Sequence, residues 1–138
     1  MTVAARQEYT IATTVALPYD EAVQKTRDAL KEEGFGILTE IDVKKTMKEK
    51  LDVDFRRYVI LGACNPPLAH KAFEVELDIG ALLPCNVIVY EEGQGCVVAA
   101  QDPEKLLSFV GNPALEPVGT EVAAKMRKVI EAVASSGR

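Results

Sequence analysis

The sequence predicts an α+β fold in which a single, mostly antiparallel sheet carries two main helices on one face. Two long segments repeat apolar residues every three to four positions, which is typical of helices with one buried side. Five shorter segments are rich in β-branched and other apolar residues, as strands are. The later strands follow one another closely, so the sustained strand–helix alternation of a parallel nucleotide-binding sheet is absent.

The composition fits one folded domain, residues 1–138. Hydrophobic residues make up 48% and charged residues 27%, which is enough apolar material for a core. There are 21 acidic and 16 basic residues, so the net charge of −5 disfavours nucleic-acid binding. The apolar runs are far shorter than the about 20 residues that cross a bilayer, and Arg6 and Glu8 interrupt any secretory apolar run. We therefore expect a cytoplasmic protein with neither nucleic-acid nor membrane partners.

The first elements are a strand and a main helix. Residues 7–17 alternate apolar and polar side chains, which predicts a half-buried strand. Residues 19–33 have a helical apolar repeat between Pro18, which suits a helix start, and Gly34, which suits a helix end. One side of this helix is predicted to pack on the sheet.

A second strand, a short helix and a third strand follow. The second strand is predicted over 35–41, and Asp42 is placed to cap a brief, lysine-rich helix. Acidic residues interleave with the lysines, so we expect this helix to be a solvated surface. Binding of phosphate or nucleic acid by the lysines is the alternative. Residues 57–63 lack polar alternation, as in a strand that is covered on both faces or central in the sheet.

Asn65 and the following proline predict the start of a short helix over 66–75. Two more strands are predicted over 86–90 and 96–100. The glycine-containing segment 91–95 between them suits a tight hairpin turn.

The C-terminal part repeats the capping signal at Asp102, which predicts a short helix that ends near Phe109. Residues 111–119 contain two prolines and two glycines and are predicted to form a loop. Thr120 then caps the second main helix, which runs to about Ser135.

The three cysteines are expected to be free thiols, because the protein is expected to be cytoplasmic and that compartment is reducing. Cys64 directly precedes Asn65 at the start of the predicted helix. Unpaired N–H groups and the positive end of the helix dipole can favour a thiolate there, so a lowered pKa is expected if the thiol is functional. The structural alternative is a small buried side chain for Cys64 and simple capping for Asn65.

The Cys-Asn pair recurs at Cys85 and Asn86, where the fourth strand begins. If the third and fourth strands are antiparallel, Cys64 and Cys85 share one pocket. If a parallel crossover joins these strands, the two thiols lie at opposite ends of them. The residues do not decide between these arrangements.

Cys96 is expected in the core, opposite Tyr90 in the hairpin and too far from Cys85 for a disulfide. His70 is the single histidine, so a cysteine–histidine enzyme or a Cys/Cys/His metal site would have to use it. No CxxC pair, fourth ligand or catalytic signature accompanies it, so we expect no metal and no cofactor, and we assign no catalytic residue.

Three stretches together resemble the domain-of-unknown-function family number 302. They are GFGILTEIDVKKTMKEKLDVDF, YVILGACNPPLAHKAF and DIGALLPCNVIVYE, and they span Gly34 to Glu91. The ACNP and LLPCN stretches carry the resemblance most specifically. It implies a TATA-box-binding-protein-like α+β fold of order β-α-β(4)-α and implies no established activity.

The sequence therefore leads to three hypotheses. The first is a binding or sensing module for a small anionic or thiol-reactive ligand near Cys64, with the ligand-binding candidates Cys64, Asn65, Cys85, Asn86 and His70. The second is a structural or stress-related protein that works as a homo-oligomer, and we expect a homodimer. The third and least favoured is a thiol enzyme in which His70 serves Cys64 as a base.

Overall fold

The computed structural model describes residues 7–136, and every strand and helix predicted above is present in it. The elements in chain order are β1 (Thr10–Val15), α1 (Tyr19–Glu32), β2 (Gly36–Asp42), α2 (Val43–Leu51), β3 (Tyr58–Cys64), α3 (Pro66–Val75), the 3-10 helix η1 (Leu77–Leu82), β4 (Cys85–Glu92), β5 (Gly95–Gln101), α4 (Pro103–Val110), the 3-10 helix η2 (Pro113–Leu115) and α5 (Glu116–Ser136).

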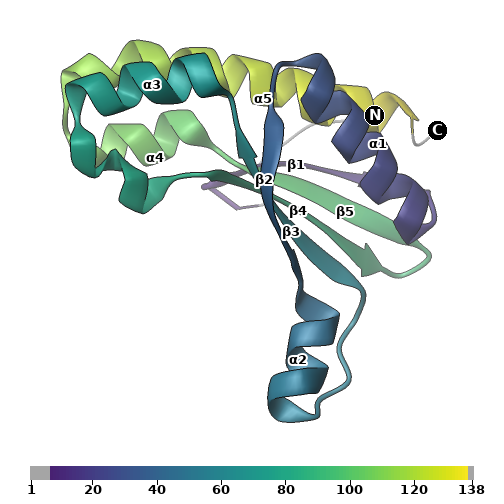
Figure 1. The fold of residues 1–138 in the computed structure, drawn as a ribbon. Helices are drawn as coiled ribbons and strands as arrows, with labels where there is room; N and C mark the ends of the chain where they lie inside the picture. Colours follow the sequence, from purple (N-terminus) through teal and green to yellow (C-terminus); the bar gives the residue numbers. More distant parts are fainter. Residues whose placement is uncertain (1–6, 137–138) are drawn as a thin grey trace.

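The five strands form one antiparallel sheet of order β1-β5-β4-β3-β2 (Figure 1). The predicted α+β class is therefore confirmed. β3 is an interior strand next to the edge strand β2. Its side chains Val59 and Leu61 are buried on one face, while Tyr58 and Ile60 are half-buried on the other. The strand is thus neither covered on both faces nor the central strand, and its lack of polar alternation reflects an open face that is itself apolar.

The β4–β5 hairpin differs from the prediction by one position. Cys96 lies opposite Glu91, and Tyr90 lies opposite Val97, because the turn between the strands has two residues. Gly93 begins that turn with a φ of 60°, which glycine adopts readily. The prediction had centred the turn on a single glycine, which shifted the register.

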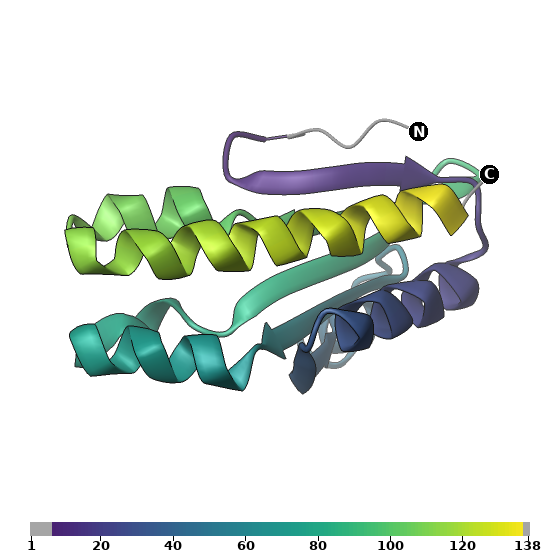
Figure 2. The ribbon, with the colours of Figure 1, turned by 90° about the horizontal axis from the view of Figure 1, so that it is seen from above.

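The main helices α1 and α5 lie side by side on one face of the sheet, with α3 and α4 on the same side (Figure 2). The largest core cluster lies between this helical layer and the sheet. Alternate strand residues such as Val87 and Val98 contribute from below, and Leu30 of α1 and Met126 and Ile130 of α5 contribute from above. Each of these five side chains is fully buried.

The predicted loop over 111–119 is wrong in its second half, because α5 begins at Glu116 instead of at Thr120. Pro117 falls in the first helical turn, where its missing N–H has no partner to lose. Asn112 caps the preceding 3-10 helix η2 with its side chain. Prolines and glycines in this segment therefore mark helix starts as well as a turn.

Within residues 7–136, no helical layer covers the opposite face of the sheet, and we call it the open face. Strand positions that alternate with the core positions point to it. They are Thr10, Ala12, Thr14, Thr39, Ile41, Tyr58, Ile60, Gly62, Asn86, Ile88, Tyr90, Glu92, Gly95, Val97, Ala99 and Gln101. Glu92 is the one charged residue among these strand positions, so the open face is nearly neutral.

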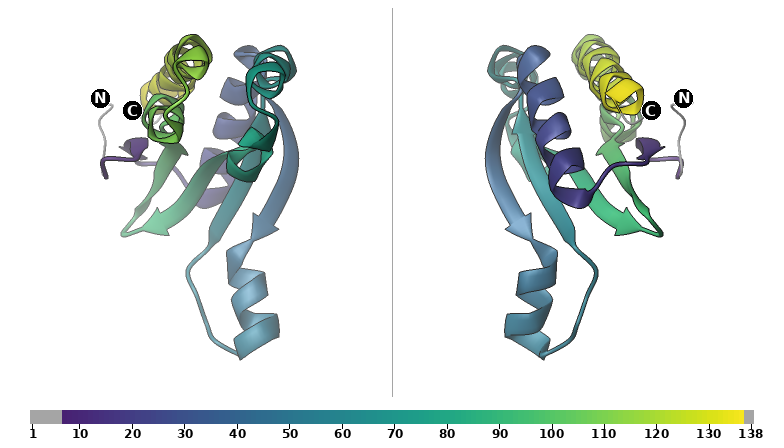
Figure 3. Two further views of the ribbon diagram at one scale, coloured as in Figure 1. Left: turned by 90° about the vertical axis from the view of Figure 1, so that its left-hand side faces the viewer. Right: turned by 90° about the vertical axis from the view of Figure 1, so that its right-hand side faces the viewer.

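The helix α2 projects from the β2–β3 end of the sheet, apart from the other helices (Figures 1 and 3). Asp42 caps it as predicted and accepts a hydrogen bond from the Lys45 backbone N–H at 2.9 Å. No residue of α2 is buried, and its four lysines are exposed, as predicted for a solvated face. None of the described helices is long and apolar enough to span a membrane.

Candidate functional site

A cavity of about 270 Å³ lies where the ends of β3, β4 and β5 meet the helices α3, α4 and α5. Its wall is mostly aliphatic and aromatic. The lining residues are Phe35, Leu38, Ala63, Cys64, Asn65, Leu68, Ala69, Ala72, Phe73, Ile79, Gly80, Leu83, Pro84, Cys85, Gln101, Pro103, Leu106, Leu107, Val118 and Val122. This set includes no acidic or basic side chain.

The outer wall of the cavity belongs to a second, smaller hydrophobic cluster. Ala72 of α3, Ile79 of η1, Leu107 of α4 and Leu115 of η2 are buried against one another there. The segment between α3 and β4 was predicted only as a connection, but it folds into η1 and closes this side. The cavity thus lies between two clusters instead of inside one.

The antiparallel arrangement of β3 and β4 brings Cys64 and Cys85 to the same cavity. Ala63 lies opposite Cys85 in the sheet register, so Cys64 is one residue further along the neighbouring strand. Both cysteines line the cavity wall and both are free thiols. Of the two arrangements that the sequence left open, the shared pocket is the correct one.

The start of α3 offers no free N–H group to a thiolate or an anion. Pro66 and Pro67 occupy its first positions and have no N–H. The next N–H, of Leu68, donates to Asn65 Oδ1 at 3.3 Å, and the N–H of Ala69 donates to the Asn65 carbonyl at 2.9 Å. The positive charge of a helix N-terminus arises from unsatisfied N–H groups, so little of it remains here.

The thiol pKa values follow from this arrangement. Burial raises the pKa of Cys64 above 9.0, so the expectation of a lowered pKa is wrong. Burial also raises the pKa of Cys85 to about 11, and the nearby Cys64 adds to that rise. Both thiols are therefore protonated near neutral pH.

The asparagine of the first Cys-Asn pair lines the cavity, and that of the second does not. Asn65 caps α3 as predicted, and its Nδ2 donates to the Glu33 carbonyl at 3.5 Å. Asn86 is exposed on the open face, because it follows the inward-facing Cys85 in a strand. Asn86 therefore does not line the cavity that Cys64 and Cys85 share, and it lines a separate hollow on the open face.

His70 also lies outside the site. Its side chain is 77% exposed on α3, and its Nδ1 lies 3.6 Å from Glu74 Oε1 one turn further along the helix. Leu68, Ala69 and Ala72 form the side of α3 that lines the cavity, and His70 is not on it. The hypothesis of a Cys64–His70 catalytic pair is therefore wrong.

Cys96 lies in the core as predicted and donates a hydrogen bond to the Leu17 carbonyl at 3.4 Å.

Gln101 is a polar residue that lines both this cavity and a hollow on the open face, and the sequence analysis missed it. It ends β5, and its Oε1 accepts from the Asn86 N–H at 3.5 Å. Its Nε2 is buried and has no hydrogen-bond partner among the described residues. A lone glutamine at the end of a strand gives no sequence signal, because its meaning depends on the helices that cover it.

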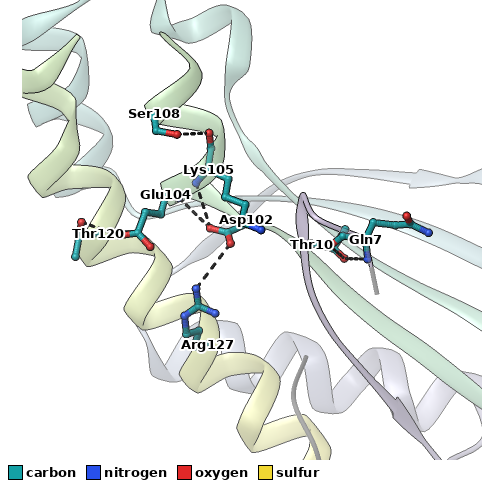
Figure 4. Close-up of polar contacts among 8 residues, drawn as sticks. All are labelled: Gln7, Thr10, Asp102, Glu104, Lys105, Ser108, Thr120 and Arg127. Atoms are coloured by element: carbon teal, nitrogen blue, oxygen red, sulfur yellow. Dashed lines mark hydrogen bonds and ion pairs between the residues drawn. The ribbon is translucent and has the colours of Figure 1, made fainter. Parts of the chain in front are cut away.

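A polar clamp fixes α4, which forms one side of the cavity, to α5. Asp102 caps α4 by accepting from the N–H groups of Glu104 and Lys105 at 3.1 and 3.4 Å. Figure 4 shows Arg127 of α5 reaching toward the same carboxylate, with a separation of 3.7 Å. Thr120 of α5 donates to Glu104 at 3.1 Å. Asp102 is only 5% exposed, so this clamp holds the two helices together from inside.

The position of Pro84, which lines the cavity, depends on a glycine on the neighbouring strand. A side chain at Gly62 would place its Cβ 2.1 Å from Thr39 Oγ1 and 2.8 Å from Pro84 Cγ. Pro84 precedes Cys85 and lines the cavity, so the absence of a side chain at Gly62 lets the β4 entrance pack closely on β3.

Comparison with known families decides the classification of this chain. The model of the family described as "Domain of unknown function DUF302" matches residues 11–133, nearly the whole chain. The chain belongs to the DUF302 family. The match covers both cysteine motifs of the cavity and all of the sheet from β1 to β5 except Thr10.

A solved DUF302 structure supports this placement. The chain is similar to the uncharacterized conserved DUF302 protein from Bacillus stearothermophilus, with 28% sequence identity and a TM-score of 0.81. The alignment covers 96% of this chain and 100% of that one. The comparison with curated proteins gives no match.

Proposed function

We propose that this DUF302 protein is a binding module for a small, uncharged and largely apolar molecule held in the cavity beside Cys64. The observation that carries the proposal is the cavity itself, about 270 Å³ between two hydrophobic clusters, with an almost wholly apolar wall. Apolar pockets with a few polar groups are the usual form of small-molecule sites.

The wall favours a neutral ligand over an anionic one. No lysine, arginine or histidine lines the cavity, and the α3 N–H groups are used or absent. Burying an unpaired charge in such surroundings costs several kcal/mol. Of the two ligand types expected from the sequence, the anionic one is therefore disfavoured.

Two groups give the cavity selectivity. The Cys64 thiol is partly exposed and protonated, so it offers a soft, polarizable contact and reacts slowly with electrophiles near neutral pH. The unpaired Nε2 of Gln101 would be satisfied by a ligand oxygen that accepts a hydrogen bond. A ligand with an apolar body and one carbonyl group suits both features.

The volume limits the ligand to about ten non-hydrogen atoms, since an apolar cavity of about 150 Å³ accommodates benzene. Acetophenone, which is neutral, and benzoate, which is anionic, have this size and serve as a matched pair of probes. We expect acetophenone to shift the NMR signals of cavity residues in a saturable way and benzoate to bind at least about tenfold more weakly.

A blocked cavity supplies the control. Ala69 lines the cavity from α3, whereas Ala124 is exposed on α5. The Ala69→Leu variant should lose acetophenone binding, and Ala124→Leu should keep it. Equal binding by both variants, no saturable shift at millimolar acetophenone, or tighter binding of benzoate would contradict the proposal.

A further inference from the structure

The segment 43–57, which we call the arm, is held to its own chain mainly at its C-terminal end, where Arg57 pairs with Asp20 at 2.6 Å and Arg56 donates to the Glu91 carbonyl at 3.1 Å. It contains α2 and the return to β3, and α2 projects away from the helical layer (Figure 3). Isolated helices shorter than about 12 residues are marginal in water. Yet Leu51, Val53 and Phe55 of the arm expose large apolar side chains, with Leu51 66% exposed.

The arm is continuous with the open face of the sheet. The Phe55 ring lies 6.1 Å from the Tyr58 ring, which stacks on Tyr90 at 5.1 Å between centroids. The guanidinium of Arg56 lies 5.9 Å from the centroid of the Tyr90 ring. Tyr58 and Tyr90 are open-face positions, so an aromatic row connects the two surfaces.

The open face is shaped for contact with another apolar surface. Ala12, Val97 and Ala99 form a floor of mainly small side chains that is at most 5% exposed, because Ile88 and Tyr90 pack against it. A shallow hollow of about 600 Å³ lies between this floor and α4, with the 88% exposed Phe109 on its lining. The large apolar side chains that stay exposed around this floor, Ile41 and Phe109 among them, are of the kind that marks sites of protein association.

The charge distribution indicates which protein covers this face. The arm carries six basic and three acidic residues, a net charge of +3. Because the whole chain has a net charge of −5, the rest of it carries −8. Arg57 is already paired with Asp20 of its own chain, and the remaining excess of basic residues attracts the arm to the acidic body of an identical chain.

Five strands about 4.8 Å apart and about 20 Å long give a face of about 500 Å². Part of this face is already buried within the chain, so the arm has to supply much of the about 800 Å² that each partner buries in a stable complex.

We propose that two copies of this chain pair through their open faces about a twofold axis, with each arm lying against the body of the other copy. The surface is separate from the cavity, so this inference does not depend on the proposed ligand. Twofold pairing requires a self-complementary surface, and two nearly neutral apolar faces, with the basic arm of each copy beside the acidic body of the other, satisfy this requirement.

Sedimentation equilibrium over the micromolar range tests the proposal. The parent chain should have twice the monomer mass of 15.0 kDa. Ile88→Lys, at a half-buried position on the open face, should weaken association at least about 100-fold, because each copy would bury an unpaired ammonium group.

A second variant removes the arm without breaking the sheet. Residues 44–57 are replaced by Asn-Gly, a two-residue turn that joins antiparallel strands such as β2 and β3. It should be monomeric, and its far-UV circular dichroism should retain the β-sheet contribution of the parent while losing that of α2.

Leu77→Lys, at an 80% exposed position in η1, is the matched control and should remain dimeric. A monomeric parent, or unchanged dimers in both Ile88→Lys and the arm replacement, would overturn the proposal. Binding of RNA or DNA by a monomeric parent would count equally against it.

Discussion

Filling the cavity from α3 should stabilise the protein. Ala69→Leu adds three carbon atoms to a half-buried side chain that lines the empty space. With about two of them buried, at about 0.8 kcal/mol each, the gain is about 1.6 kcal/mol. Ordering the leucine side chain and its slightly lower helix propensity cost about 0.7 kcal/mol. The net expectation is about 1 kcal/mol of added stability, or about 3 °C in melting temperature for a chain of this size.

Urea denaturation monitored by circular dichroism measures this change, with calorimetry for the melting temperature. Ala124→Leu makes the same substitution at an exposed position of α5 and should change stability by less than about 0.5 kcal/mol. If Ala69→Leu lost 1 kcal/mol or more relative to Ala124→Leu, the space beside α3 would not be able to hold the added atoms. The cavity would then be too small for the proposed ligand.

Three further predictions concern the walls of the site. Alkylation of Cys64 should accelerate with pH up to a midpoint above 9.0, and Cys85, with a pKa of about 11, should react later. Peptide mass spectrometry separates the two, and a Cys64 midpoint below 8.5 would contradict the absence of free N–H groups at α3. Asp102→Ala removes a buried cap and should cost about 1–2 kcal/mol in urea denaturation, where a cost under 0.5 kcal/mol would show that the clamp is unimportant. Gly62→Ala should destabilise by at least about 2 kcal/mol. Adding Thr39→Ala should restore part of this loss, and strict additivity of the two changes would show that the contact with Thr39 is not its cause.

Local signals predicted much of the fold. Asp42, Asn65 and Asp102 each cap a helix with the side chain, as expected from residue type and the position of the following residues. Such signals act over three or four residues, so they can be read without the fold. The hairpin register at Cys96 was missed by one position, because one or two turn residues give equally good local patterns.

The site was harder to predict because it depends on contacts between distant segments. The shared position of Cys64 and Cys85 required the strand direction, which the sequence left open. The lowered thiol pKa was wrong because two prolines and the Asn65 cap together remove the N–H groups that a helix start normally offers. His70 was chosen for its chemistry alone, and the helical phase of α3 turned it outward.

The small cluster formed by Ala72, Ile79, Leu107 and Leu115 is separate from the main core, so this part of the molecule can open locally while the rest stays folded. Amide protons of α3 and η1 should exchange with deuterium sooner than those of β4 and β5, because these two elements pack mainly on each other and make few contacts with the larger core. A guest molecule could then enter and leave while the sheet stays intact.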